Sequence, residues 1–172
     1  AARRVGEGLL VDVGSTTTDI LVLAGGEVRA LGWSDRERLA AGELIYTGLT
    51  RTPVMAVADR APFGGRWHGL TAEHFATMAD VHRVLSTLDE AADQHPAADN
   101  GPKTAEASAR RLARMIGADL ADGRTADWRR LADWLATAQR RTIEDALRLA
   151  LSRGLLGETA PLLLIGMNAF IT

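Results

Sequence analysis

The stretch LVDVGSTTTDI, residues 10–20, places a carboxylate, a glycine and four hydroxyl side chains between two apolar runs. The runs at 8–13 and 19–24 are short and apolar, which predicts two buried strands. Gly25-Gly26 then predicts a tight hairpin turn into a third strand at 27–33. The chain is therefore expected to open with three consecutive strands.

The rest of the chain changes to a helical pattern. Apolar residues recur with a period near 3.6 in three segments, which predicts helices at 71–88, 105–116 and 128–154, the first capped by Thr71. Shorter elements are expected before them: a helix at 35–39 that Gly42 ends, strands at 45–47 and 54–57, and a loop with an edge strand at 61–70. A last apolar strand is predicted at 161–165.

This order of elements predicts an α/β fold: a mixed sheet opened by a β-hairpin, with helices packed on it. The 172 residues suit one domain. Because both ends of the sequence lie close to a predicted strand, we expect residues 1–172 to be a piece of a longer protein.

Composition excludes several classes of function. The 20 basic and 22 acidic residues give a net charge of −2, so no basic surface for nucleic acid or an anionic membrane is expected. The absence of cysteine excludes disulfides, thiolate catalysis and cysteine-based metal sites. No apolar run has the roughly 18–20 residues of a membrane span. We expect a cytoplasmic protein; the sequence leaves homo-oligomers open.

The opening motif has the residues of a magnesium–phosphate site. Gly14 lets an anion approach the backbone, and successive N–H groups of a turn form an anion-binding concavity. Asp12 would repel a phosphate unless a cation lay between them, and Mg²⁺ is typically held by one or two carboxylates and phosphate oxygens. Four hydroxyl side chains add donors: Ser15, Thr16, Thr17 and Thr18. The alternative is an ordinary hairpin turn, in which serine and threonine are common.

The motif VDVGSTTTDI resembles the second phosphate-binding loop of the actin, sugar kinase and heat-shock chaperone superfamily, and within it the hydantoinase A/oxoprolinase group. Four further segments resemble the tetrahydromethanopterin-linked C1-transfer pathway proteins: ERLAAGELIYTGLTRTPV (37–54), FATMADVHRVL (75–85), HPAADNGPK (95–103) and SARRLARMIG (108–117). The resemblance covers residues 8–153. It implies the C-terminal half of an actin-like, ribonuclease H-like ATPase fold.

The resemblance also implies a function. The group includes a methanofuran-biosynthesis transferase that displaces diphosphate from an aminomethylfuran diphosphate, so a small phosphorylated substrate is expected. Asp12 with Mg²⁺ and residues 14–18 would hold the diphosphate, and Arg51 would pair with it. One alternative is an ATP-dependent hydantoinase/oxoprolinase-like hydrolase, although 165–170 keeps only the first glycine of the nucleoside turn. Another is an inactive fragment, because the first phosphate loop of the expected two-lobed cleft is absent.

Other polar residues have weaker patterns. Glu43 and Tyr46 either contact substrate or cap and pack, and the second interpretation is favoured. The four histidines, at positions 68, 74, 82 and 95, lack the spacing of a zinc motif. Asp99 and Lys103 either reach a ligand or belong to a solvated loop. The arginines at 110, 111 and 114 are expected on an exposed helix face.

Overall fold

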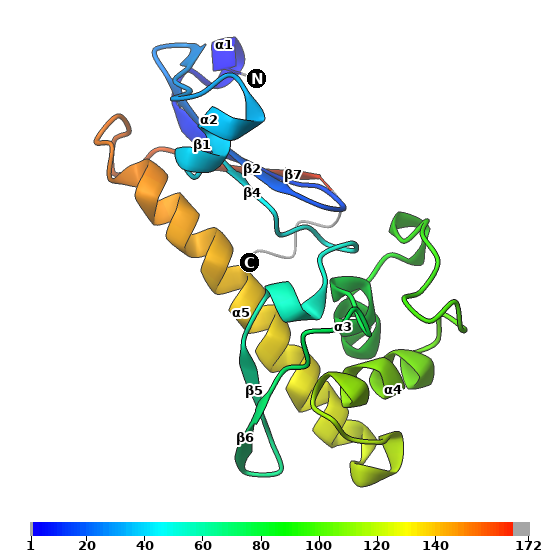
Figure 1. Cartoon of the computed structure of the whole chain (residues 1–172). Coiled ribbons are helices and arrows are strands. Elements are labelled where there is room, and N and C mark those ends of the chain that lie inside the picture. The colour runs from blue at the N-terminus through cyan, green and yellow to red at the C-terminus, as the bar shows by residue number, and fades with distance from the viewer. Residues whose placement is uncertain (1, 167–172) are drawn as a thin grey trace.

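The computed structural model describes residues 2–166, and a mixed sheet forms one end of it (Figure 1). Strand β1 (Gly8–Val13) pairs antiparallel with β2 (Thr18–Ala24) and parallel with β7 (Leu162–Gly166). Strands β3 (Glu27–Val28) and β4 (Leu44–Ile45) both pair with β2. The predicted α/β class, with a mixed sheet that begins with a hairpin, is confirmed.

The helical part of the molecule lies beyond β4. Within residues 2–166, its elements are three 3₁₀ turns, the β5–β6 hairpin and three of the five α-helices. The other two helices are short and lie beside the sheet (Figure 1). The bounds are α1 Ala2–Val5, α2 Asp35–Ala40, α3 Met78–Leu85, α4 Ala105–Met115, α5 Thr125–Leu151, β5 Arg60–Phe63, β6 Arg66–Gly69, and 3₁₀ turns Val54–Ala56, Glu90–Ala92 and Leu120–Asp122. Among the residues described, no helix is both long and apolar enough to cross a bilayer.

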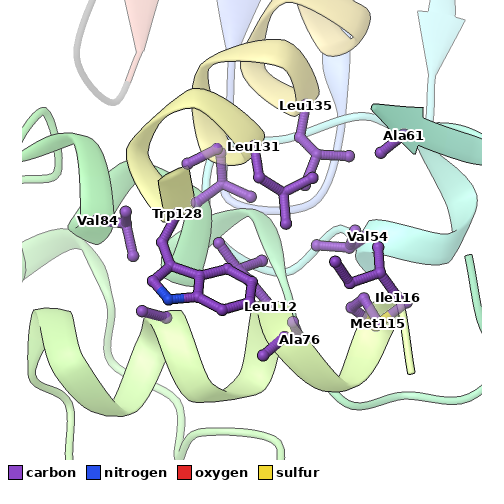
Figure 2. Packing of buried hydrophobic residues seen from close by; sticks show 14 of the residues in the cluster. Val54, Ala61, Ala76, Val84, Leu112, Met115, Ile116, Trp128, Leu131 and Leu135 are labelled. Atoms are coloured by element: carbon purple, nitrogen blue, oxygen red, sulfur yellow. The ribbon is translucent and has the colours of Figure 1, made fainter. Parts of the chain in front are cut away.

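Helix α5 joins the two parts (Figure 1). Its C-terminal half places Ile143, Ala146 and Ala150 against the inward side chains of β1 and β2. Its N-terminal half contributes Trp128, Leu131 and Leu135 to a larger core shared with α3 and α4, seen in Figure 2. Burial of apolar area is the main favourable contribution to folding. This one 27-residue helix therefore contributes to the stability of both parts, because it buries apolar side chains in each core.

Two of the predicted strands differ clearly in the structure. The third strand ends at Val28, because the Glu43 carboxylate accepts the amides of Leu31 and Gly32 in place of a neighbouring strand. Residues 54–56 form a 3₁₀ turn, so the predicted strand at 54–57 is wrong.

The first long helix begins later than predicted. Thr77, not Thr71, precedes α3, and the amide of Thr77 donates to Asp80 in a reciprocal cap (3.1 Å). Thr71 instead donates its amide to Met115 at the end of α4. A capping box satisfies two backbone donors at once, which explains why the helix begins at this second threonine.

Candidate phosphate site

The turn between β1 and β2 is the centre of the candidate site. The Gly14 amide donates to the Thr17 carbonyl (2.8 Å), which closes the turn. Within residues 2–166 no hydrogen bond uses the amides of Ser15, Thr16 or Thr17. Three successive amides are therefore available to an anion, as in the backbone concavities that bind phosphate.

The hydroxyl groups of the motif divide into two kinds. Those of Ser15 and Thr16 lie 3.4 Å apart on half-buried residues of the turn, and Thr17 is half-buried too. Thr18 is fully buried, and its hydroxyl donates to the Thr47 carbonyl (2.6 Å). Because this bond occupies the only proton of that hydroxyl, we assign the Thr18 side chain to supporting the turn.

Asp12 and Asp19 lie directly opposite each other on β1 and β2. Like charges in this position repel unless a cation compensates them. Arg38 of α2 pairs with Asp19. In the described part of the chain no basic side chain pairs with Asp12, which is half-buried. A cation from outside the chain would therefore be stabilised at Asp12.

A second segment, residues 47–52, packs against the turn and donates hydrogen bonds to it. The amides of Leu49 and Arg51 donate to the carbonyls of Gly14 and Ser15 (2.9 and 2.8 Å). Gly48 packs so tightly that an added Cβ would lie 2.5 Å from the carbonyl carbons of Ser15 and Thr16. Sequence reasoning missed Gly48; the short TGLT run at 47–50 is its only local signal.

The backbone of Arg51 thus contacts the turn, as expected if Arg51 and the turn bind the same diphosphate. Its side chain is exposed and forms no hydrogen bond or ion pair with the residues described. A guanidinium beside a turn with available amides can address a phosphate through its planar fork of donors. The roles of Asp12, Arg51 and the turn as ligands stay predictions.

A pocket of about 680 Å³ lies on the sheet face opposite α5. Asp12 and Asp19 are at its polar end, and Leu10, Leu21 and the exposed Trp33 line its apolar part. Side chains alternate between faces along a strand, so the same register that buries Val11 under the sheet directs Asp12 into this pocket. The pocket offers a carboxylate next to an apolar wall.

The end of β7 closes the site beside Asp12. Gly166 has φ +102°, and an added Cβ there would lie 2.7 Å from the Asp12 carboxylate. Only glycine fits this backbone and this approach. The predicted change in the nucleoside turn at 167–170 lies outside the described residues.

The histidines do not form a metal site. His74 precedes α3, so it does not share a helix with His82. His82 is buried in contact with Thr87 and Gln139, and burial lowers its pKa. Among residues 2–166 no three His, Asp or Glu side chains gather in the way a protein metal cage requires. A metal at Asp12 would need ligands from its phosphate partner and water, as Mg²⁺ commonly does.

The loop residues Asp99 and Lys103 pair within the protein. Asp99 accepts from Arg111 (2.8 Å), and Lys103 donates to the Asp93 carbonyl (2.6 Å). Arg111 is 1% exposed, so the prediction that it lies on an exposed helix face is wrong. Its guanidinium also donates to Asp80 of α3 (2.8 Å). The Asp99 bond holds loop 86–104 on α4, the Lys103 bond lies within the loop, and the Asp80 bond joins α4 to α3.

Glu43 also has a structural position. It is buried and binds Arg153 at the end of α5 (2.9 Å) as well as the two amides after β3. Tyr46, in contrast, is exposed. The predicted capping and packing role therefore fits Glu43, whereas Tyr46 lies outside the core.

The sequence defines the class of protein: the chain belongs to the hydantoinase/oxoprolinase family, whose pattern matches residues 1–166. The family has an actin-like ATPase fold, in agreement with the fold predicted from the opening motif. The resemblance inferred from residues 10–20 is confirmed.

Two relatives share one name, (4-{4-[2-(gamma-L-glutamylamino)ethyl]phenoxymethyl}furan-2-yl)methanamine synthase. That of Methanocaldococcus jannaschii is 38% identical over 111 residues, 64% of this chain and 33% of the relative. That of Methanococcus vannielii is 33% identical over 112 residues, 65% of this chain and 50% of the relative. The matched region thus spans a third to a half of these relatives.

Proposed function

We propose that this chain supplies a phosphate-binding wall to an enzyme of methanofuran biosynthesis. The reaction would transfer the furan-methyl group of an aminomethylfuran diphosphate to the phenolic oxygen of a tyramine derivative. The bond between the furan-methyl carbon and the diphosphate breaks, and diphosphate is released. The observation that carries the proposal is the turn 14–17, whose three available amides follow closely in the chain after Asp12, a carboxylate that pairs with no cation of the described chain. The names of the two relatives support it.

The residues of the turn would act on the leaving group. As the carbon–oxygen bond breaks, its electron pair stays on the diphosphate. The phenolic oxygen forms the new bond to carbon and passes its proton to water or to the departing diphosphate. Donors already aimed at the place where negative charge develops lower the barrier. The amides of residues 15–17 and the hydroxyls of Ser15 and Thr16 are such donors, and the Arg51 side chain extends from the segment beneath them.

Asp12 is suited to hold Mg²⁺ at this place, because it is half-buried and its cross-strand neighbour Asp19 is already neutralised by Arg38. When bound, the metal would neutralise charge between the carboxylate and the diphosphate. The apolar part of the adjoining pocket, with Trp33 at its edge, could accommodate a furan ring.

An ATP-dependent hydrolase of the hydantoinase/oxoprolinase kind is the second candidate, and the family match supports it. The same turn would then hold nucleotide phosphates. A third reading is a binding module whose cleft lacks its second wall. The three are separated by their ligands: release of diphosphate from the furan substrate, ATP hydrolysis stimulated by a cyclic amide, or neither.

The test compares Asp12→Asn with the matched change Asp19→Asn in the full-length protein. Release of diphosphate from aminomethylfuran diphosphate is measured over a range of Mg²⁺ concentrations. We expect Asp12→Asn to lower the rate about a hundredfold or more and to weaken its dependence on Mg²⁺, whereas Asp19→Asn keeps most activity. Full activity in Asp12→Asn would refute the role of Asp12, and ATP hydrolysis without diphosphate release would favour the second candidate.

A further inference from the structure

Gln139 is a fully buried polar residue at the middle of α5. One turn before it, Ala136 belongs to the helical core, and one turn after it, Ile143 belongs to the core under the sheet. Segment 47–52 crosses from the sheet to the helical part at this level (Figure 1). Gln139 therefore lies at the junction between the two cores.

The amide group of Gln139 binds the segment that carries the phosphate turn. Its Nε2 donates to the Gly48 carbonyl (2.8 Å) and to the Thr47 hydroxyl oxygen (3.1 Å). The Thr47 carbonyl in turn accepts from Thr18 at the end of the turn. Two bonds from one side chain thus fix the residues on either side of the 47–48 peptide.

The other end of the amide fixes its orientation. The Oε1 atom lies 3.2 Å from His82 Nε2 on α3. Burial lowers the pKa of His82 and favours the neutral ring, and a proton on Nε2 donates to Oε1. With the oxygen held by His82, the amino group of Gln139 must face Gly48, which sets the direction of both donated bonds.

The contact of Gly48 with the turn links the hydrogen bonds of Gln139 to the geometry of the proposed anion site. Gly48 packs directly on the peptide between Ser15 and Thr16, whose N–H is one of the three available amides. The next residues of the segment donate their amides to the carbonyls of Gly14 and Ser15. A shift of Gly48 would move the turn and misdirect its donors, and donors that must reorganise bind and stabilise charge less well.

We propose that Gln139 is a positioning residue for the phosphate turn: it holds Gly48 against Ser15 and Thr16 and so keeps the amides of the turn aimed at the anion. The inference rests on the proposed function of the turn. A buried amide costs stability unless its groups are bonded, and at this position an apolar side chain would fill the core equally well. The bonds to Thr47 and Gly48 are what an apolar side chain lacks.

The test uses Gln139→Met, which keeps the length of the side chain and removes its donors, in the full-length protein. The control is Leu131→Ala, a truncation on the same helix in the helical core, remote from the turn. Binding of diphosphate with Mg²⁺ is measured by calorimetry well below the melting temperature of each variant. We expect about a tenfold weaker Kd for Gln139→Met, from two lost hydrogen bonds, and an unchanged Kd for Leu131→Ala despite its lower melting temperature.

A second measurement separates this inference from the proposed function. Hydrogen exchange of peptides spanning 47–52 should be faster in Gln139→Met than in Leu131→Ala, with or without ligand. A wild-type Kd in Gln139→Met, or unchanged protection of 47–52, overturns the inference. If the wild type binds no diphosphate, the proposed function fails, and the exchange result alone decides whether Gln139 positions the segment.

Discussion

Replacing Gly48 by alanine tests whether the turn and segment 47–52 are as tightly packed as the structure indicates. The new Cβ would lie 2.5 Å from two backbone carbonyl carbons, those of Ser15 and Thr16, and closer still to the Thr16 amide nitrogen. Backbone atoms cannot rotate away as the end of a flexible side chain can. Overpacking of this kind costs about 2 kcal/mol, and in a protein of this size we expect the melting temperature to fall by about 4–8 °C.

The matched control is Gly69→Ala. Gly69 ends β6, its φ is not in the left-handed region, and nothing lies within 4 Å of an added Cβ. A glycine replaced at such a place loses entropy only in the unfolded chain, so the variant should be as stable as the wild type or about 0.5 kcal/mol more stable. Urea denaturation of both variants gives the comparison. Equal midpoints for Gly48→Ala and Gly69→Ala would refute the packing argument.

Two further predictions concern buried charge and pH. Arg111→Met should destabilise the protein by about 3–5 kcal/mol, because Asp80 would stay buried without its closest cation. The control Arg110→Met removes an exposed ion pair and should cost less than about 1 kcal/mol. Equal urea midpoints for the two variants would contradict this prediction. His82 has a lowered pKa in the folded state, so below the unfolded value of 6.5 the unfolded chain binds more protons and stability should fall as the pH falls. In His82→Gln this loss should be absent when unfolding is followed at several pH values, and a slope equal to that of the wild type would show that another group titrates.

Local signals in the sequence predicted much of the sheet. The Gly25-Gly26 pair has φ +63° and +75°, which other residues rarely adopt, and it forms the expected turn. The apolar periodicity of residues 128–154 likewise predicted α5, which spans Thr125–Leu151. The residues that determine such elements are close together in the sequence, so the elements can be predicted without knowledge of the fold.

The errors arose where a specific polar partner, and not the apolar period, decides the structure. Arg111 follows Ala107 by four residues on α4 and so shares its buried face. Its charge is compensated there by Asp80, from another helix, and by Asp99, from the preceding loop. Thr71 and Thr77 are both acceptable caps, and Asp80 decides between them by completing a capping box at Thr77. Neither choice could be made from periodicity alone.

In the candidate site, too, some residues could be predicted from the sequence and others could not. The residues of the turn could be named from the sequence because they are contiguous, whereas Gly48 and Gln139, which hold them, lie 32 and 123 residues beyond Thr16. Residue type gave little warning: glycine is common in loops, and a glutamine within a helix is ordinary. Their importance follows from the way α5 bridges two cores, since the segment that passes between these cores must be fixed to the helix if the turn above it is to keep a defined shape.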